Sequence, residues 1–204
     1  MNQKMKALDL VDRHRYLRQG MIQQALRQRR RTSQHMLRTL AMDKLLYRFR
    51  LDSKEQYIYH ADKTRSAKWA HWLAVNEFHF ALLKRLQVRQ RVLFYQLEYR
   101  YPFGQADGIY VVQTHLDGGI LFFLEMDDGA NQFDKVENYE RYYLSRRWVQ
   151  EPWADPMQKG VPVFPAVVCV TPRAKEIEKL AARAEKVSWQ VYPDAEKAAK
   201  GVIR

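Results

Sequence analysis

The sequence has one cysteine, and it has no long uninterrupted run of apolar residues. The single cysteine, Cys169, excludes an intramolecular disulfide framework and a cysteine-rich zinc site. It lies in the apolar run of residues 166–170, which predicts a small buried side chain rather than a nucleophile. No stretch approaches the roughly 18 apolar residues that span a bilayer, and residues 1–15 are charged too often for a signal peptide. We therefore expect a soluble cytoplasmic protein with no membrane partner.

Acidic residues are scarce in the first third of the chain. Residues 1–70 carry 17 Lys and Arg against 6 Asp and Glu, a net charge of +11. Residues 71–204 carry 18 against 17, a net charge of +1. Charge sorted in this way predicts two parts with different partners, and a compact cationic region is typical of a nucleic-acid contact. The alternative is a solvated surface that only keeps the protein soluble.

Apolar spacing predicts three short helices in the basic part, over residues 5–13, 19–26 and about 32–43. Four apolar side chains of the third helix form one buried stripe: Met36, Leu37, Leu40 and Ala41. We expect Thr32 and Ser33 to cap the beginning of this helix. We expect His35, next to the stripe, to pack against the core.

A β-hairpin is predicted after the third helix. Two alternating segments, residues 45–51 and 56–60, are joined by a turn at residues 52–55. Three short helices followed by a hairpin are typical of a winged helix-turn-helix, which we expect over residues 1–62. In such a module the third helix enters the major groove of DNA and its first residues face the bases.

Basic and polar side chains lie at the two places where this module would meet double-stranded DNA. Those expected to face base edges are Arg31, Ser33, Gln34 and Arg38. Those expected to contact phosphates are Arg29, Arg30, Arg48, Arg50 and Lys54. For the arginine run 29–31, the alternative is a solvated loop.

The second part predicts an α/β domain over residues 70–192, after a hinge at residues 61–70. Its helices are expected at residues 70–86, 132–147 and 171–186. Its strands are expected at residues 92–101, 108–114, 120–126, 163–170 and 189–192, with a tight turn at 115–119 and a loop at 151–165. This order predicts a mixed sheet flanked by helices, followed by a tail at residues 193–204. The whole chain is therefore expected to be an α+β protein.

Acidic side chains lie at the ends of these predicted strands. Asp107 precedes the second strand, and Glu125 and Asp127 end the third. Carboxylates at neighbouring strand ends converge, and Asp107 with Glu125 is a pair of oxygen ligands that suits Mg²⁺. Lys135 is expected to reach the same place, and so is Glu77, because a carboxylate in an apolar helix needs a partner. The alternative is that these acids only solvate the sheet or pair with the basic part.

Four short blocks of the second part resemble one protein family. They are His71-x-Leu-Ala-Val-Asn-Glu77, Ala106-Asp107-Gly108, Phe123-Leu-Glu-Met-Asp127 and Lys135-x3-Tyr139. In this order the blocks are similar to the replication-relaxation family of plasmids and other mobile elements. The resemblance extends to about residue 186, and the winged helix expected over residues 1–60 matches the usual N-terminal part of that family.

The resemblance implies a DNA-binding protein of plasmid replication, relaxation or mobilisation, with a core similar to the PD-(D/E)xK nuclease fold. In the nuclease pattern, an Asp, a Glu and a Lys two positions after the Glu form the active site. Asp107 and Glu125 match the first two, but Asp127 stands where the Lys belongs, and Lys135 is displaced along the chain. A basic group that offsets charge on the attacked phosphate is a large part of such catalysis.

Two functions follow from these observations. The first is an accessory or regulatory protein that binds duplex DNA and works with relaxase or replication proteins, with a homodimer as a common state of winged-helix proteins. The second is a metal-dependent DNA nuclease that uses Asp107 and Glu125 with Mg²⁺. The nearly neutral charge of residues 71–204 favours the first, because a nuclease domain that grips DNA needs basic surface of its own.

Overall fold

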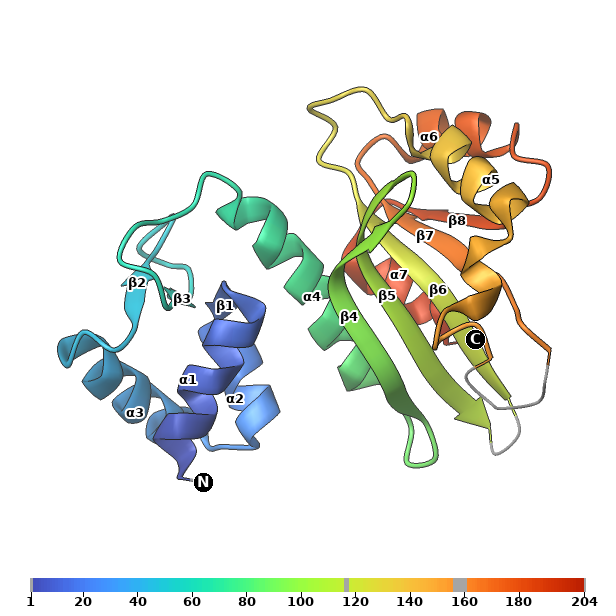
Figure 1. The fold of residues 1–204 in the computed structure, drawn as a ribbon. Helices are drawn as coiled ribbons and strands as arrows, with labels where there is room; N and C mark the ends of the chain where they lie inside the picture. Colours follow the sequence, from blue (N-terminus) through green and yellow to red (C-terminus); the bar gives the residue numbers. More distant parts are fainter. Residues whose placement is uncertain (1, 116–117, 156–160, 204) are drawn as a thin grey trace. The chain divides into compact units, whose positions relative to one another are not determined.

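A computed structural model describes residues 2–115, 118–155 and 161–203 (Figure 1). Its internal contacts divide the chain into two compact units, Met1–Asn76 and Glu77–Arg204. Both helices and strands occur in each unit, so the chain is an α+β protein as expected. Among the described residues, no helix combines the length and the apolar character that a membrane span requires.

The first unit contains three complete helices, the beginning of a fourth and a small antiparallel sheet. Its helices are α1 (Gln3–His14), α2 (Gln19–Leu26) and α3 (Arg30–Met42). Its strands are β1 (Leu17–Arg18), β2 (Tyr47–Phe49) and β3 (Ile58–His60), in the order β1-β3-β2. The three predicted helices and the predicted hairpin are all present, although the hairpin strands are shorter than expected, and β1 completes the sheet between α1 and α2.

The beginning of α3 differs from the prediction. The helix begins at Arg30, after the extended residue Arg29, and the amide of Ser33 already bonds the Arg29 carbonyl at 3.0 Å. Thr32 and Ser33 therefore lie within the helix and do not cap it. Because Ser33 is three and four positions before Met36 and Leu37, it falls on their buried side and is fully buried.

The second unit contains a five-stranded mixed sheet. Its strands are β4 (Arg91–Tyr101), β5 (Gly104–His115), β6 (Gly118–Met126), β7 (Ala166–Val170) and β8 (Trp189–Tyr192), hydrogen-bonded in chain order. The pairs β4–β5 and β5–β6 are antiparallel, whereas β6–β7 and β7–β8 are parallel. The helices are α4 (Trp69–Arg85), which begins in the first unit, α5 (Lys135–Ser145), the 3-10 helix η1 (Arg147–Gln150), α6 (Ala174–Ala181) and α7 (Ala195–Val202).

Helices cover both faces of this sheet (Figure 1). Successive residues of a strand point to opposite faces, so Phe122 and Phe123 of β6 mark the two sides. Phe123 contacts Tyr139 of α5 with ring centroids 5.1 Å apart, whereas Phe122 contacts Phe78 of α4 at 5.9 Å. An ion pair of 2.7 Å joins α4 to α7 and places α7 on the α4 side. The parallel pairs of the sheet therefore lie between two helical layers, as parallel strands generally do.

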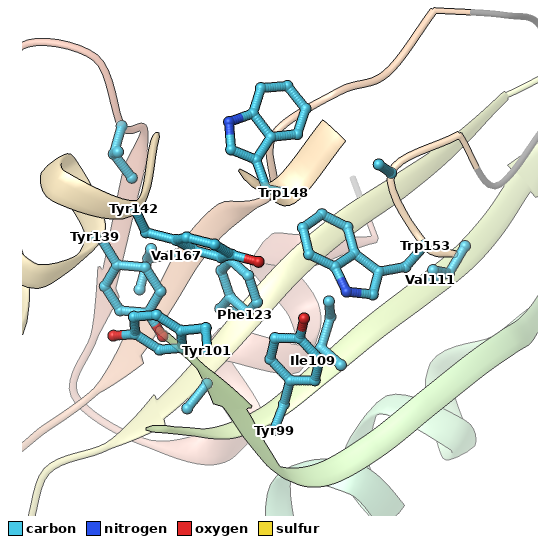
Figure 2. Packing of buried hydrophobic residues seen from close by; sticks show 13 residues of the cluster. Tyr99, Tyr101, Ile109, Val111, Phe123, Tyr139, Tyr142, Trp148, Trp153 and Val167 are labelled. Carbon is cyan, nitrogen blue, oxygen red and sulfur yellow. The ribbon is translucent and has the colours of Figure 1, made fainter. Parts of the chain in front are cut away.

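The core on the α5 side is unusually aromatic, and Figure 2 shows its side chains stacked around Phe123. Tyr101 stacks on both Tyr139 and Tyr142, with ring centroids 5.1 and 4.9 Å apart. Trp153 meets the edge of Phe123 at 5.6 Å. Aromatic pairs in these geometries stabilise a core beyond their buried area, so this cluster fixes α5 against the sheet.

Replacement of Phe123 by alanine is expected to lower the free energy of unfolding by about 3–5 kcal/mol, because it removes a fully buried ring from this stack. Urea denaturation followed by tryptophan fluorescence measures the change. Phe94→Ala is the matched control, since that ring is 41% exposed, and an equal loss in both variants would contradict this account of the core.

The domain boundaries differ from the sequence prediction. The two units meet between Asn76 and Glu77, within α4, and not in the segment 61–70. That segment is held in the first unit: the amide of Ser66 bonds the Tyr16 hydroxyl at 2.7 Å, and the Arg65 guanidinium lies 4.8 Å from the Phe49 ring centroid. The predicted hinge is therefore part of a packed unit.

The C-terminal segment 193–204, predicted as a tail, contains α7. Asp194 caps this helix by accepting a 2.8 Å hydrogen bond from the Lys197 amide, and Ala198, Ala199 and Val202 are buried. The small side chains allow close packing on β7 and β8. Two other predictions fall partly outside the described residues: the turn at 115–119, at residues 116–117, and the loop at 151–165, at residues 156–160.

Candidate nucleic-acid interface and acidic site

A pocket of about 330 Å³ opens in the first unit between α2, α3 and the β2–β3 hairpin. We call it the α3–hairpin pocket. Six of the nine residues predicted to contact DNA line it: Arg30, Gln34, Arg38, Arg48, Arg50 and Lys54. They come from α3, from β2 and from the turn of the hairpin, so the fold brings together side chains that lie up to 24 positions apart in the sequence.

The α3 side of the pocket is one polar row on an amphipathic helix. Arg30, Gln34 and Arg38 are spaced four residues apart, which places them one above another on a helix. All three side chains are exposed, whereas Met36 and Leu37 are buried on the other side. The apolar stripe thus fixes the direction in which the row points.

The hairpin side of the pocket holds two guanidinium groups on one aromatic ring. The Cζ atoms of Arg48 and Arg50 lie 4.3 and 4.4 Å from the ring centroid of Tyr57. Arg50 also donates a 2.8 Å hydrogen bond to the Ser53 carbonyl. Burial raises the pKa of the neighbouring Tyr59, an effect that the Arg48 guanidinium partly offsets. The two arginines are therefore preorganised before any ligand binds.

Three predicted DNA contacts lie outside the lining of the pocket. Arg29 and Arg31 are exposed at the beginning of α3, beside the row. Ser33 is fully buried, so its prediction as a base contact is wrong. His35 is exposed, so the prediction that it packs in the core is also wrong.

In the second unit, the acidic site is built around Glu125, whose side chain is 3% exposed. The Tyr139 hydroxyl donates a 2.6 Å hydrogen bond to its Oε1 atom, and Lys135 Nζ lies 3.2 Å from its Oε2 atom. Lys135 also donates a 2.5 Å hydrogen bond to the Gln105 carbonyl. Lys135 and Tyr139 are one helical turn apart on α5, and that spacing directs both toward Glu125.

The environment of Glu125 favours its protonated form. Burial, and then the nearby Asp107 charge, raise its pKa from an ordinary value of 4.5 to about 8. Lys135 and the Tyr139 hydroxyl act in the opposite direction and offset only part of this rise. Lys135 is more exposed than Glu125, at 28%, which weakens its attraction for the carboxylate because water screens it. Glu125 is therefore expected to ionise at a higher pH than an ordinary glutamate.

Asp107 lies beside Glu125 but within β5, not before it as predicted. Gly108 pairs with Leu124 in the antiparallel ladder, which places the preceding residue of β5 next to Glu125. Its Oδ2 atom accepts a 2.7 Å hydrogen bond from the Met126 amide. In the part of the chain that the structure describes, no group of three or more His, Cys, Asp and Glu side chains is placed to hold a metal ion.

Asp127, predicted as a third catalytic acid, belongs to a separate ion pair. The Nη2 atom of Arg173 lies 3.0 Å from its Oδ1 atom and 3.1 Å from its Oδ2 atom, and the Thr171 hydroxyl donates a 2.6 Å hydrogen bond to Oδ2. The Gly129 amide bonds its Oδ1 atom at 3.1 Å. These contacts join the end of β6 to the beginning of α6, so the structure gives Asp127 a positioning role.

Glu77 does not reach the acidic site. It lies on α4, which covers the face of the sheet marked by Phe122, whereas Lys135 and Tyr139 reach Glu125 from the α5 face. Of the five predicted catalytic residues, the structure therefore brings together Asp107, Glu125 and Lys135. Cys169 is fully buried as predicted, and burial raises the pKa of its thiol.

Several pocket residues were absent from the sequence prediction: Gln19, Gly20, Gln23, Gln56 and Tyr57. Tyr57 follows from the hairpin itself, because the pairing of Phe49 with Ile58 places Tyr57 opposite Arg50. The α2 residues have no comparable signal, since only the packing of α2 beside the hairpin brings them to the pocket.

Comparison of the whole chain with models of protein families finds no match. Searches among curated proteins and among solved structures also find no significant similarity.

Proposed function

We propose that the first unit is a winged helix-turn-helix that binds double-stranded DNA, with α3 in the major groove and the β2–β3 hairpin as the wing. The observation that carries this proposal is the convergence of Arg30, Gln34, Arg38, Arg48, Arg50 and Lys54 on the α3–hairpin pocket. The order of helices and strands and the sheet order β1-β3-β2 support it. So does the net charge of +11 on residues 1–70.

Within this proposal, side chains divide by what they would contact. Gln34 and Arg38 suit adenine and guanine edges, because each presents paired hydrogen-bonding atoms to a base. Arg29, Arg30, Arg48, Arg50 and Lys54 suit phosphates, which give affinity without sequence information. Arg31 lies close enough along α3 to take either role.

The salt dependence of binding tests this proposal. If the five phosphate-facing side chains all contact the backbone, log K is expected to fall with log salt concentration with a slope of about −4 to −5. Fluorescence anisotropy with a labelled duplex, titrated over a range of salt concentrations, gives the slope. A slope near zero, or no binding at low salt, would contradict DNA binding by this unit.

For the chain as a whole, we propose an accessory or regulatory protein of plasmid or mobile-element replication, relaxation or mobilisation. The support is the resemblance of its sequence blocks to the replication-relaxation family, together with the proposed winged helix. Relaxase or replication proteins are the partners that this role implies. The second unit, with a net charge near zero, then contributes packing or protein contacts rather than a second DNA grip.

The alternative is a nuclease with a PD-(D/E)xK-like core, and the proximity of Asp107, Glu125 and Lys135 is the observation in its favour. The Arg173 partner of Asp127 and the net charge near zero of residues 71–204 argue against it. We expect supercoiled plasmid to remain intact with Mg²⁺ or Mn²⁺. Nicking by the parent chain but not by the Asp107→Ala, Glu125→Ala variant would overturn this expectation.

A further inference from the structure

The α3–hairpin pocket has the dimensions of a small-molecule site. Its volume of about 330 Å³ falls at the lower end of the range for such sites, about 300–1,000 Å³. Contact with the edges of stacked base pairs needs a protruding helix, and contact with phosphates needs only exposed cations. Neither base-edge contact nor phosphate contact with a duplex therefore requires a concave site between α2, α3 and the wing.

The charges in this pocket predict an anionic ligand. Five cationic side chains line it, and Glu55 is the one carboxylate among the residues of the lining. Glu55 lies 3.3 Å from Arg18, so part of its charge is already offset. Arg48 and Arg50, held on the Tyr57 ring, present guanidinium groups that suit the oxygens of a phosphate.

The pocket also contains four glutamine side chains: Gln19, Gln23, Gln34 and Gln56. An amide both donates and accepts hydrogen bonds, as does the edge of a nucleobase. Gln56 is already oriented, because its Oε1 atom accepts a 2.9 Å hydrogen bond from the Gly20 amide. A phosphate without a base only accepts hydrogen bonds, so it cannot pair with the amide oxygens of these glutamines. The combination of cationic and amide side chains therefore suits a nucleotide, which carries both a phosphate and a base.

A base within a continuous duplex is stacked and paired, so it cannot enter a pocket without leaving the helix. We propose that the α3–hairpin pocket binds one unpaired nucleotide, which makes DNA with an interrupted duplex the preferred ligand of this unit. This inference rests on the proposed DNA-binding function and specifies the form of DNA that is bound. The arginines hold the phosphate of the nucleotide, and the glutamines hold its base.

Three labelled duplexes of the same sequence and length test this inference by fluorescence anisotropy with the full chain. The first is continuous, the second carries one bulged adenosine, and the third carries an abasic nucleotide at the bulge. We expect the adenosine bulge to bind about tenfold more tightly than the other two, the factor of one well-made set of base contacts. The abasic bulge separates base capture from the easier bending of a bulged duplex.

Gln23→Leu is the diagnostic variant, because Gln23 lines the pocket and lies outside the predicted DNA contacts. It is expected to abolish the preference for the adenosine bulge and to leave binding of the continuous duplex unchanged. Gln24→Leu, at an exposed neighbouring position in α2, is the matched control and should keep the preference.

The outcomes distinguish the inference from the function on which it rests. Equal affinity for all three DNAs, or equal gains for both bulges, would overturn nucleotide capture and leave duplex binding in place. A preference that survives Gln23→Leu would also overturn it. If the chain binds none of the three DNAs, the proposed function is overturned, and the inference with it.

Discussion

A chain in which Arg38 and Arg48 are both replaced by alanine is expected to bind duplex DNA about a hundredfold more weakly than the parent chain. The two side chains lie on opposite walls of the α3–hairpin pocket, one on α3 and one on β2. Both are exposed, so their removal leaves the core intact. Anisotropy titration at one fixed salt concentration measures the loss, and circular dichroism checks that the helices remain.

We expect DNA binding to depend on where the cationic side chains lie and not on the net charge of the chain alone. Lys179→Ala with Lys200→Ala is the matched control, since it removes two exposed cations from α6 and α7 of the second unit. The control is expected to bind within about twofold of the parent, because its two cations belong to the second unit and not to the proposed DNA-binding unit. Equal losses in the two variants would mean that binding depends only on net charge.

Replacement of Glu125 by glutamine is expected to remove most of the pH dependence of stability in the second unit. The folded pKa of Glu125, about 8, lies above its ordinary value of 4.5. Between these values the folded state binds more protons than the unfolded state, so stability is lost as pH rises. From about pH 5 to pH 8 the parent is expected to lose about 3.5 kcal/mol through this group, whereas the variant has no carboxyl to ionise.

Urea denaturation at several pH values, followed by tryptophan fluorescence, measures this difference. The difference in unfolding free energy between parent and variant at each pH removes the contribution of groups that titrate equally in both, such as the buried His14 of the first unit. Glu137→Gln, on the exposed side of α5, should retain the slope of the parent. If the parent and Glu125→Gln lose the same stability between pH 5 and pH 8, the pKa of Glu125 is not raised.

The elements that the sequence predicts well are those with strong apolar periodicity. Met36, Leu37 and Leu40 of the predicted stripe are buried in α3, although its fourth member, Ala41, is only half-buried. The five strands predicted along the second unit are all present in a mixed sheet. Burial of one helix face or of a central strand leaves a pattern of apolar spacing that the sequence alone reveals. The same period, extended backward by one turn, places Ser33 on the buried side.

The elements that the sequence predicts poorly depend on contacts between distant segments. Asp127 and Glu125 are two positions apart, yet one bonds Arg173 and the other bonds Lys135 and Tyr139. Only the tertiary packing of α6 and α5 beside the end of β6 separates their roles. Likewise, α7 is held by tertiary contacts of small side chains such as Ala198 and Ala199, which have little apolar signal of their own.

Hydrogen exchange of the full chain with and without a DNA duplex tests most directly where the protein meets DNA. We expect slower amide exchange in α3 (Arg30–Met42) and in the hairpin at residues 47–60 when DNA is bound, because ligand contact suppresses local opening. Exchange in the five-stranded sheet should be unchanged. Protection confined to residues 77–204, with α3 and the hairpin unaffected by a duplex that demonstrably binds, would contradict the account.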